Sequence, residues 1–233
     1  MIRRFAPIVC GTLMLASTAG AQIGHLPAQS PYHDLEYKQE LTLIGGSFLA
    51  HRDPANAAPQ SGALIGARYA WRAAGPANLT AEISRIQSDR QLINPFVVGP
   101  GRDIGTTSRP LYSANLGLAL NVTGAKSWHN IVPEVAAGLG VISDLRSKAD
   151  SGGFKFGTRF AINWGGGIRW VPTGGRWQVR GDITNRLYTI SYPEAFYLVP
   201  TGAPAGSAVL APQQARSFWT NNPAFTLGIS RLF

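Results

Sequence analysis

Hydrophobic and polar residues alternate with a period of two through most of the chain after residue 21. In residues 176–187, one set of positions reads Arg, Gln, Arg, Asp, Thr, Arg and the other reads Trp, Val, Gly, Ile, Asn, Leu. This alternation is typical of a β-strand with two chemically different faces. Helical spacing of apolar residues is missing, and no later run approaches the roughly 18 apolar residues of a membrane-spanning helix. The pattern therefore predicts an all-β chain.

Eight segments with this alternation predict eight strands. They cover residues 35–50, 62–73, 77–90, 109–123, 130–145, 154–171, 176–191 and 218–233. The connections alternate between long and short, and glycine, proline and asparagine occur in nearly all of them. Long loops at one end and short turns at the other are typical of outer-membrane barrels. The predicted fold is an eight-stranded antiparallel up-and-down transmembrane β-barrel with short periplasmic turns and longer extracellular loops.

The chemistry of the two strand faces indicates which one turns outward. One face is apolar and aromatic, whereas the other is small, polar and charged in both signs. An eight-stranded barrel encloses only a narrow interior, which cannot easily hold several tryptophans beside the leucines and isoleucines. We therefore expect the apolar face to contact lipid, with aromatic residues at the two interfaces. Beside the short turns lie the predicted interfacial aromatics Trp71, Trp170 and Trp177.

The inward charges need partners, because breaking a buried ion pair costs about 3–5 kcal/mol. Both signs should therefore occur at similar depths in the lumen. The acidic candidates are Glu40, Glu82, Glu134 and Asp182, and the basic candidates are Lys38, Arg68, Arg159 and Arg180. We predict a ladder of ion pairs among them. The favoured interpretation is that these residues fill the lumen and satisfy one another, and the alternative is that they line a gated or permeant path.

The N-terminus has the three parts of a secretory signal peptide. "MIRRF" is basic, "APIVCGTLMLAS" is apolar, and Ala19 and Ala21 fit the A-x-A cleavage pattern. We expect a signal peptide at 1–21, a periplasmic N-terminal stub at 22–34 and an outer-membrane barrel domain at 35–233. Cleavage would remove Cys10, the one cysteine of the sequence, so the mature chain would have no thiol or disulfide chemistry.

Charge narrows the choice of partners. Charged residues make up 14% of the chain, well below the roughly 25% of ordinary soluble domains. The chain has 21 basic and 12 acidic residues, but the basic ones are spread singly. This spread argues against nucleic-acid binding. The expected partners are outer-membrane lipid and the outer-membrane assembly machinery, the protein is expected to be a monomer, and no ligand is indicated.

Several segments carry a resemblance to a known superfamily. They are the N-terminal signal sequence, "PEVAAGLGVIS", "FAINWGGGIRWVPTGGRWQVRGDITN" and the terminal Phe233. Over roughly residues 30–233 the chain resembles the small outer-membrane β-barrel superfamily, which holds the OmpA membrane domain and OmpW-like proteins. The match is to an architecture. It implies a location in the bacterial outer membrane of a Gram-negative cell envelope.

The resemblance also implies that the terminal strand carries the recognition signal for the assembly machinery. That signal is a final aromatic residue preceded by apolar residues at alternate positions. The residues that fit are Phe225, Leu227, Ile229 and Phe233. Arg231 departs from the pattern, since an aromatic residue is common there, but a long arginine side chain can extend to the interface.

Catalytic patterns are weak. None of His25, His33, His51 and His129 has a serine and an acid at the spacing of a hydrolase site. No metal-ligand cluster or phosphate-binding glycine motif is present, so we expect no catalytic residues, no metal and no cofactor. The predicted function is a non-enzymatic integral outer-membrane barrel with a structural or surface-interaction role. The alternatives are a narrow, porin-like conduit for small or hydrophobic molecules and a lipid-modifying barrel enzyme.

The long loops 91–108 and 192–217 are the remaining functional candidates. Both contain apolar stretches, "NPFVVGPG" and "PEAFYLVPTGAPAGSAVL", that are unusual for exposed loops. They could pack on the rim of the barrel, plug its mouth or bind a partner. Rim packing is the favoured interpretation.

Deletion of Phe233 is expected to impair insertion, because the assembly machinery would lose the aromatic end of its signal. Heat-modified gel mobility of the membrane fraction measures folded barrel. Normal assembly of the truncated chain would contradict this prediction.

Overall fold

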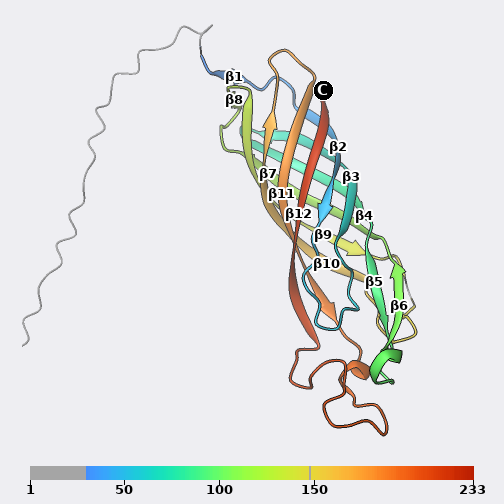
Figure 1. Ribbon diagram of the computed structural model, residues 1–233. Coiled ribbons are helices and arrows are strands. Elements are labelled where there is room, and N and C mark those ends of the chain that lie inside the picture. The colour runs from blue at the N-terminus through green and yellow to red at the C-terminus, as the bar shows by residue number, and fades with distance from the viewer. Residues whose placement is uncertain (1–29, 147) are drawn as a thin grey trace, which may run out of the picture. The chain divides into compact units, whose positions relative to one another are not determined.

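The computed structural model describes residues 30–146 and 148–233 (Figure 1). The predicted signal peptide, and residues 22–29 of the predicted stub, lie outside the described residues. Residues Pro31–Phe233 form one unit with its own internal contacts.

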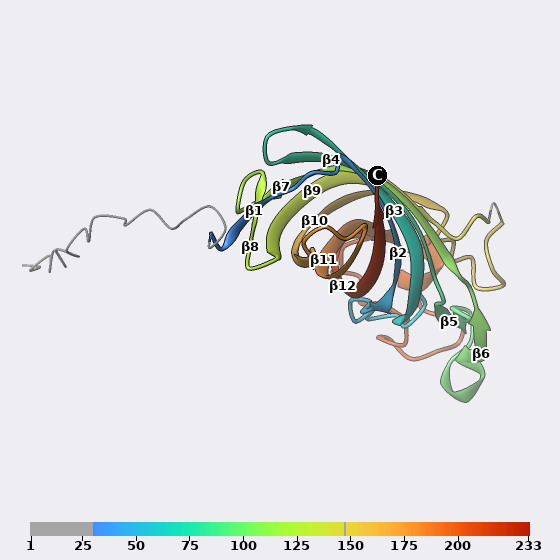
Figure 2. The same cartoon turned by 90° about the horizontal axis from the view of Figure 1, so that it is seen from above.

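Eight long antiparallel strands close into a barrel, which confirms the predicted fold. Neighbouring strands pair in chain order, and the pairings of β7 with β9 and of β12 with β2 complete the ring. Figure 2 shows the strands curving around a common interior. The eight strands are β2 (Gln39–Phe48), β3 (Gly62–Ala74), β4 (Ala77–Ile86), β7 (Leu111–Asn121), β9 (Ile131–Ser143), β10 (Thr158–Trp170), β11 (Trp177–Ser191) and β12 (Ser217–Leu232).

The last residue takes part in the closing seam. The carbonyl oxygen of Phe233 accepts the backbone N–H groups of Lys38, at 3.2 Å, and Gln39, at 3.3 Å. The N–H of Phe233 donates to the carbonyl oxygen of Gln39 at 2.9 Å. Because the first and last strands pair over their whole common length, the barrel has no open sheet edge.

The connections between the long strands contain short strands and 3₁₀ helices. β1 (Tyr32–Asp34) pairs with β8 (Lys126–Trp128), which lies in the turn between β7 and β9. β5 (Asp89–Ile93) and β6 (Asp103–Ser108) form a separate hairpin in the third connection. The 3₁₀ helices are η2 (Gly99–Arg102) and η3 (Glu194–Tyr197). Among the described residues, no helix is long and apolar enough to cross a membrane.

The first strand begins later than the alternation predicts. The sequence places its start at residue 35, whereas β2 begins at Gln39. Residues 35–38 instead connect β1 to β2, because the ladder with β3 begins only at the pair of Gln39 and Trp71. The part of the predicted stub that the structure describes, residues 30–34, includes β1.

The outer wall is apolar along the strands. Leu43 is 70% exposed and Leu227 is 74% exposed, whereas the alternate residues Thr42 and Thr226 are buried. At the short-turn end, the exposed rings are Trp71, Trp128, Trp170, Trp177 and Phe233. At the loop end, Tyr112, Phe160 and Trp219 are exposed. The two faces are therefore divided as the alternation predicts.

Arg231 is accommodated by aromatic rings. Its guanidinium carbon lies 5.9 Å from the ring centre of Trp177 and 5.6 Å from that of Phe233. Trp177 is the direct partner of Arg231 across the β11–β12 ladder. The cation therefore lies over the negative faces of two rings, which is a favourable electrostatic arrangement at the edge of an apolar wall.

The loop end of the lumen is filled by an apolar plug. Inward residues of the strands pack there against residues of the first, fifth and seventh connections. The strand residues include Phe48, Leu64, Ile86, Leu111, Ile142 and Tyr188, and the loop residues include Ala57, Phe154, Phe156, Phe196 and Leu210. Phe196 and Leu210 of the seventh connection are buried in this cluster, which removes their side chains from water. The third connection instead leaves Phe96, Val97, Val98 and Ile104 exposed.

Two adjacent glycines at the seam between β2 and β12 differ sharply in the space that they leave for a side chain. A Cβ on Gly46 would clash with the carbonyl oxygen of Phe225 and lie 2.8 Å from the Cα of Thr226. A Cβ on Gly45 would meet nothing closer than the carbonyl oxygen of Leu64 at 4.0 Å.

Gly46→Ala is therefore expected to lower the free energy of unfolding by about 1–3 kcal/mol through overpacking. The control Gly45→Ala should change it by less than about 0.5 kcal/mol. Urea unfolding in lipid vesicles, followed by gel mobility, measures both. Equal losses for the two variants would show that the close approach at the seam does not limit stability.

Candidate functional site

An ion-pair cluster occupies the middle of the barrel lumen. Four arginines and four carboxylates form it, so the cluster as a whole is neutral. The period-two alternation points these side chains inward from six different strands, and the strand register brings them to adjacent heights. The members are Glu40, Arg68, Glu82, Glu134, Arg169, Arg180, Asp182 and Arg186.

Arg180 is the centre of the cluster. Its side chain is 1% exposed. Its Nε and Nη2 donate to the two carboxylate oxygens of Asp182 at 2.8 and 2.7 Å. Its Nη1 donates to Oε1 of Glu40 at 3.1 Å, and its Nη2 also pairs with Glu134. Three carboxylates therefore surround one guanidinium group, and this excess of negative charge requires further cations.

Arg169 supplies a cation on the short-turn side. Its Nη1 donates to Oε2 of Glu40 at 3.0 Å, and its Nε lies 3.1 Å from Oε2 of Glu134. Its Nη2 donates to the side-chain oxygen of Asn121 at 2.6 Å. Two of its three nitrogens therefore donate hydrogen bonds, whereas Nε lies beside the Glu134 carboxylate without a hydrogen bond.

Arg68 and Arg186 complete the cluster on the loop side. Nε and Nη2 of Arg68 both donate to Oε2 of Glu82, at 3.0 and 2.9 Å. Arg186 donates to the other oxygen of Glu82 at 2.9 Å. The remaining nitrogen of Arg68 lies 3.6 Å from Glu134 and 3.7 Å from Asp182, which joins this group to the centre.

Neutral side chains satisfy the lone pairs that remain. The hydroxyls of Thr42 and Ser230 donate to Oε1 of Glu40 at 2.8 and 2.9 Å. Nη1 of Arg186 donates to the hydroxyl of Ser84 at 3.2 Å. With Asn121 of β7 and Ser230 of β12, all eight strands contribute a side chain to the network. Nε of Arg169 and Nδ2 of Asn121 are the network atoms that have no hydrogen-bond partner among the described residues. The many satisfied bonds between strands still rigidify the lumen.

Six of the eight candidate residues from the sequence belong to this cluster, and two do not. Lys38 precedes β2, is exposed, and lies near the short-turn opening rather than beside the carboxylates. Arg159 lies near the loop end of β10, where its Nε donates to the carbonyl oxygen of Phe156 at 2.9 Å. The alternation placed Arg159 on the correct face, but the carboxylates lie at a different depth of the barrel.

Sequence reasoning missed Arg169 and Arg186 as cluster members. Both occupy inward positions of their strands, so the alternation does contain the signal for them. Charge matching alone could not choose between Arg159 and Arg169, because they lie on the same face of β10. The strand register decides between them. Glu134 pairs across the ladder with Gly167, and Arg169 lies only two residues after Gly167, so Arg169 is at the depth of Glu134.

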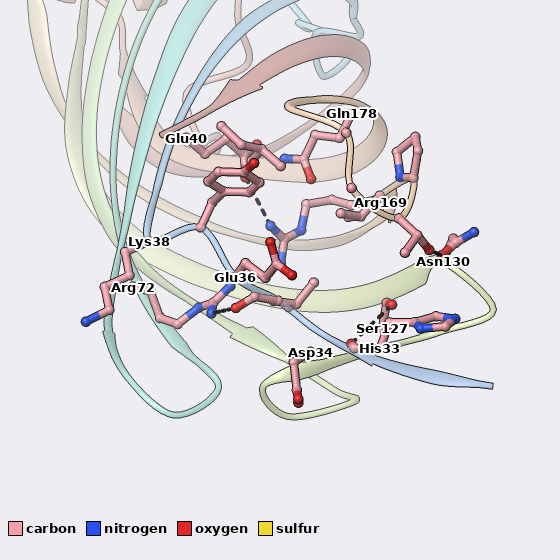
Figure 3. A pocket seen from close by; sticks show the side chains of 18 of the residues that line it. His33, Asp34, Glu36, Lys38, Glu40, Arg72, Ser127, Asn130, Arg169 and Gln178 are labelled. Carbon is pink, nitrogen blue, oxygen red and sulfur yellow. Dashed lines mark hydrogen bonds and ion pairs between the residues drawn. The ribbon is translucent and has the colours of Figure 1, made fainter. Parts of the chain in front are cut away.

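A cavity of about 290 Å³ lies between the cluster and the short-turn end (Figure 3). The residues before β2 and the turn between β10 and β11 form part of its wall. Arg169 and Gln178 also line it, so this cavity borders the cluster directly. Within the described part of the chain, no group of His, Cys, Asp and Glu side chains is placed to hold a metal ion.

Polar contacts hold the loops over the plug. Asp53 accepts the backbone N–H groups of Ala55, at 3.1 Å, and Ala58, at 2.6 Å, and the hydroxyl of Tyr192 donates to it. Burial raises the pKa of the Asp53 carboxyl above its ordinary 3.8, although the backbone donors oppose this shift. Arg90 and Asp150 pair at 2.7 Å and link the third connection to the fifth.

Comparisons with known proteins find similarity in fold only. No family model matches the chain, and no curated protein matches it. The crystal structure of Neisserial surface protein A is similar with 14% identity and a TM-score of 0.49, covering 84% of this chain and 97% of that one. The crystal structure of the N-terminal beta-barrel domain of Pseudomonas aeruginosa OprF is similar with 12% identity and a TM-score of 0.44, covering 84% and 98%.

Glu134→Gln is expected to lower the free energy of unfolding by about 3–5 kcal/mol, because it leaves four buried arginines with three carboxylates. Urea unfolding in lipid vesicles measures the change. The control Arg159→Gln also alters an inward charge but lies outside the cluster, so it should cost about 1 kcal/mol or less. A similar small loss for both variants would mean that the cluster is not held by charge pairing.

Proposed function

We propose that the chain is a non-enzymatic integral protein of the bacterial outer membrane, with a structural or surface-interaction role. The observation that carries this proposal is the exposed apolar outer wall of a barrel whose interior is charged. A monomeric soluble protein rarely exposes a contiguous apolar patch larger than a few hundred Å². Apolar side chains are stable in contact with the hydrocarbon of a lipid bilayer. A closed barrel is also stable there, because all its backbone N–H and C=O groups are hydrogen-bonded between strands.

The distribution of aromatic residues supports the same proposal. Most exposed rings occur near the ends of the strands, and leucine, isoleucine and valine side chains lie between them together with Trp164 and Phe225. Tryptophan and tyrosine favour membrane interfaces because they combine an apolar ring with a polar group. In this proposal, the short turns face the periplasm and the long loops face the outside, and lipid and the assembly machinery are the partners of the barrel wall and of its terminal strand.

The contents of the lumen support a closed barrel over a conduit. The ion-pair cluster crosses the middle of the lumen, and the apolar plug fills the loop end. Passage of a solute would require the pairs of Arg180 to separate and the side chains of Phe154 and Phe196 to leave the mouth. Both steps expose groups to an unfavourable environment, charges in one case and aromatic rings in the other.

The third connection supports a surface-interaction role. Its hairpin of β5 and β6 extends from the loop end of the barrel (Figure 1). Near its tip, the exposed apolar side chains are Phe96, Val97, Val98 and Ile104. Clustered exposed apolar residues on a loop are typical of a contact surface.

Planar-bilayer recording tests the closed barrel. The wild-type protein is expected to give no stable conductance steps above the bilayer baseline. Replacement of the seventh connection, residues 192–216, by a short glycine-containing turn should not open it, because the ion-pair cluster still blocks the lumen. Steady ion conductance of the wild-type protein would overturn the closed-barrel proposal in favour of the conduit.

A further inference from the structure

Arg231 is a cation on the outer wall that has no acidic partner. Its side chain is exposed on β12, between the cross-strand partners Leu41 and Trp177. Among the residues that the structure describes, no ion pair and no hydrogen bond joins its guanidinium group to an oxygen. The rings of Trp177 and Phe233 attract the charge, but they offer no oxygen to its N–H donors. These donors are therefore available to a ligand.

A groove of about 1200 Å³ runs along the outer wall from Arg231. Its base includes Gly45 of β2 and Gly181 of β11, which pair with Leu227 from its two sides. A Cβ on Gly45 would meet nothing closer than 4.0 Å, and a Cβ on Gly181 would meet Cδ2 of Leu227 at 3.5 Å. Two open troughs therefore flank the Leu227 side chain. The apolar residues that border them are Leu41, Leu43, Ile168, Trp170, Val179 and Ile229.

The position and length of the groove suit a lipid molecule. Arg231 is level with the exposed ring of Trp177, at the height where interfacial aromatic residues meet lipid headgroups. From Arg231 to Leu227 the groove follows β12 for about 13 Å, which covers about 10 Å of depth at a strand tilt of roughly 40°. One leaflet of the hydrocarbon core is roughly 15 Å deep. A phosphate bound at Arg231 would therefore leave its acyl chains in the troughs over most of this depth.

The charged groups at this end of the seam are mainly basic. Lys38, whose N–H donates to the oxygen of Phe233 at 3.2 Å, is exposed, and so is Arg176, the residue before β11. No ion pair joins either side chain to a carboxylate within the described part of the chain. The carboxylates outside the buried cluster here are those of Glu36 and of Phe233 at the end of the sequence. With Arg231, the cations outnumber these carboxylates, and this balance favours an anionic ligand.

From these observations we infer that Arg231 and the groove bind one anionic phospholipid of the periplasmic leaflet. The planar guanidinium group would pair with two oxygens of the phosphate, and the two acyl chains would lie in the troughs on either side of Leu227. Lipid chains gain only dispersion contacts in an open trough, so the charge of the headgroup carries most of the selectivity. The inference rests on the proposed membrane location, and it adds a lipid class and a position to the general contact of the wall with lipid.

Native mass spectrometry of the protein refolded in detergent micelles tests the site. Dimyristoyl-phosphatidylglycerol, which is anionic, and dimyristoyl-phosphatidylcholine, which is zwitterionic with the same chains, are titrated separately. We expect the barrel to retain phosphatidylglycerol with a dissociation constant about fivefold lower than that of phosphatidylcholine, which corresponds to one surface charge pair. Equal retention of the two lipids would overturn the inference.

Arg231→Gln is expected to weaken phosphatidylglycerol binding about fivefold, because it removes the charged donor. Arg85→Gln is the matched control, since it removes another exposed cation of the outer wall, at the loop end of β4. The control should change binding less than about twofold, because exposed charges this far apart are screened by salt. If the two arginine variants weaken binding equally, the lipid is held by general charge attraction and the proposed site is wrong.

Gly45→Leu tests the troughs without changing any charge. A leucine there fills one trough and should weaken phosphatidylglycerol binding about threefold. Ala81→Leu is the control, because it adds a leucine to the exposed face of β4, outside the groove. Heat-modified mobility verifies that each variant is folded. If Arg231→Gln does not fold, this pair still decides, since equal binding by Gly45→Leu and Ala81→Leu contradicts the inference.

Flotation of the wild-type protein with lipid vesicles separates this inference from the proposed function. If the protein does not float, both the membrane location and the lipid site are wrong. If it floats but shows no preference for phosphatidylglycerol, only the lipid site is wrong.

Discussion

An eight-stranded barrel encloses a narrow interior, and this dictates how its inward side chains are arranged. There is little room for water around an inward charge, so each charge must be neutralised by protein. Four arginines and four carboxylates satisfy this requirement as one neutral network around Arg180. The network crosses the lumen between strands that are distant in sequence, so it also fixes their relative heights.

The lumen contains a polar part and an apolar part, which are held closed by different interactions. The polar half is held by directional bonds, such as those of Arg68 and Arg186 to the two oxygens of Glu82. The loop half is held by close packing of rings, including the perpendicular contact of Phe156 with Tyr188 at 5.6 Å. An opening motion that loosens one half leaves the other in place, which explains why a single loop change is not expected to create a passage.

Particular residues show how far sequence reasoning reached. Glu134, Arg180 and Asp182 were placed in the lumen by alternation and by the cost of an unpaired buried charge, and the structure joins them directly. Lys38 and Arg159 obey the same alternation, yet they lie outside the cluster. Alternation gives the face of a strand to which a residue belongs, whereas pairing also needs its depth, and depth depends on strand register and on where each strand begins. The alternation includes Phe154 in the predicted strand 154–171 on its apolar face, whereas β10 begins at Thr158 and Phe154 is buried. Phe196 lies in a loop without a periodic signal, so the burial of neither ring could be read from the pattern.

The strand number, the antiparallel order, the apolar outer wall and the polar interior could all be predicted from residue patterns, because a period-two pattern acts locally along each strand. The tertiary structure decided which charges meet, which loops fill the mouth and where the buried amide of Gln178 lies. These are contacts between residues far apart in the chain. They depend on the closing seam and on the register of eight strands together, and no single segment contains that information.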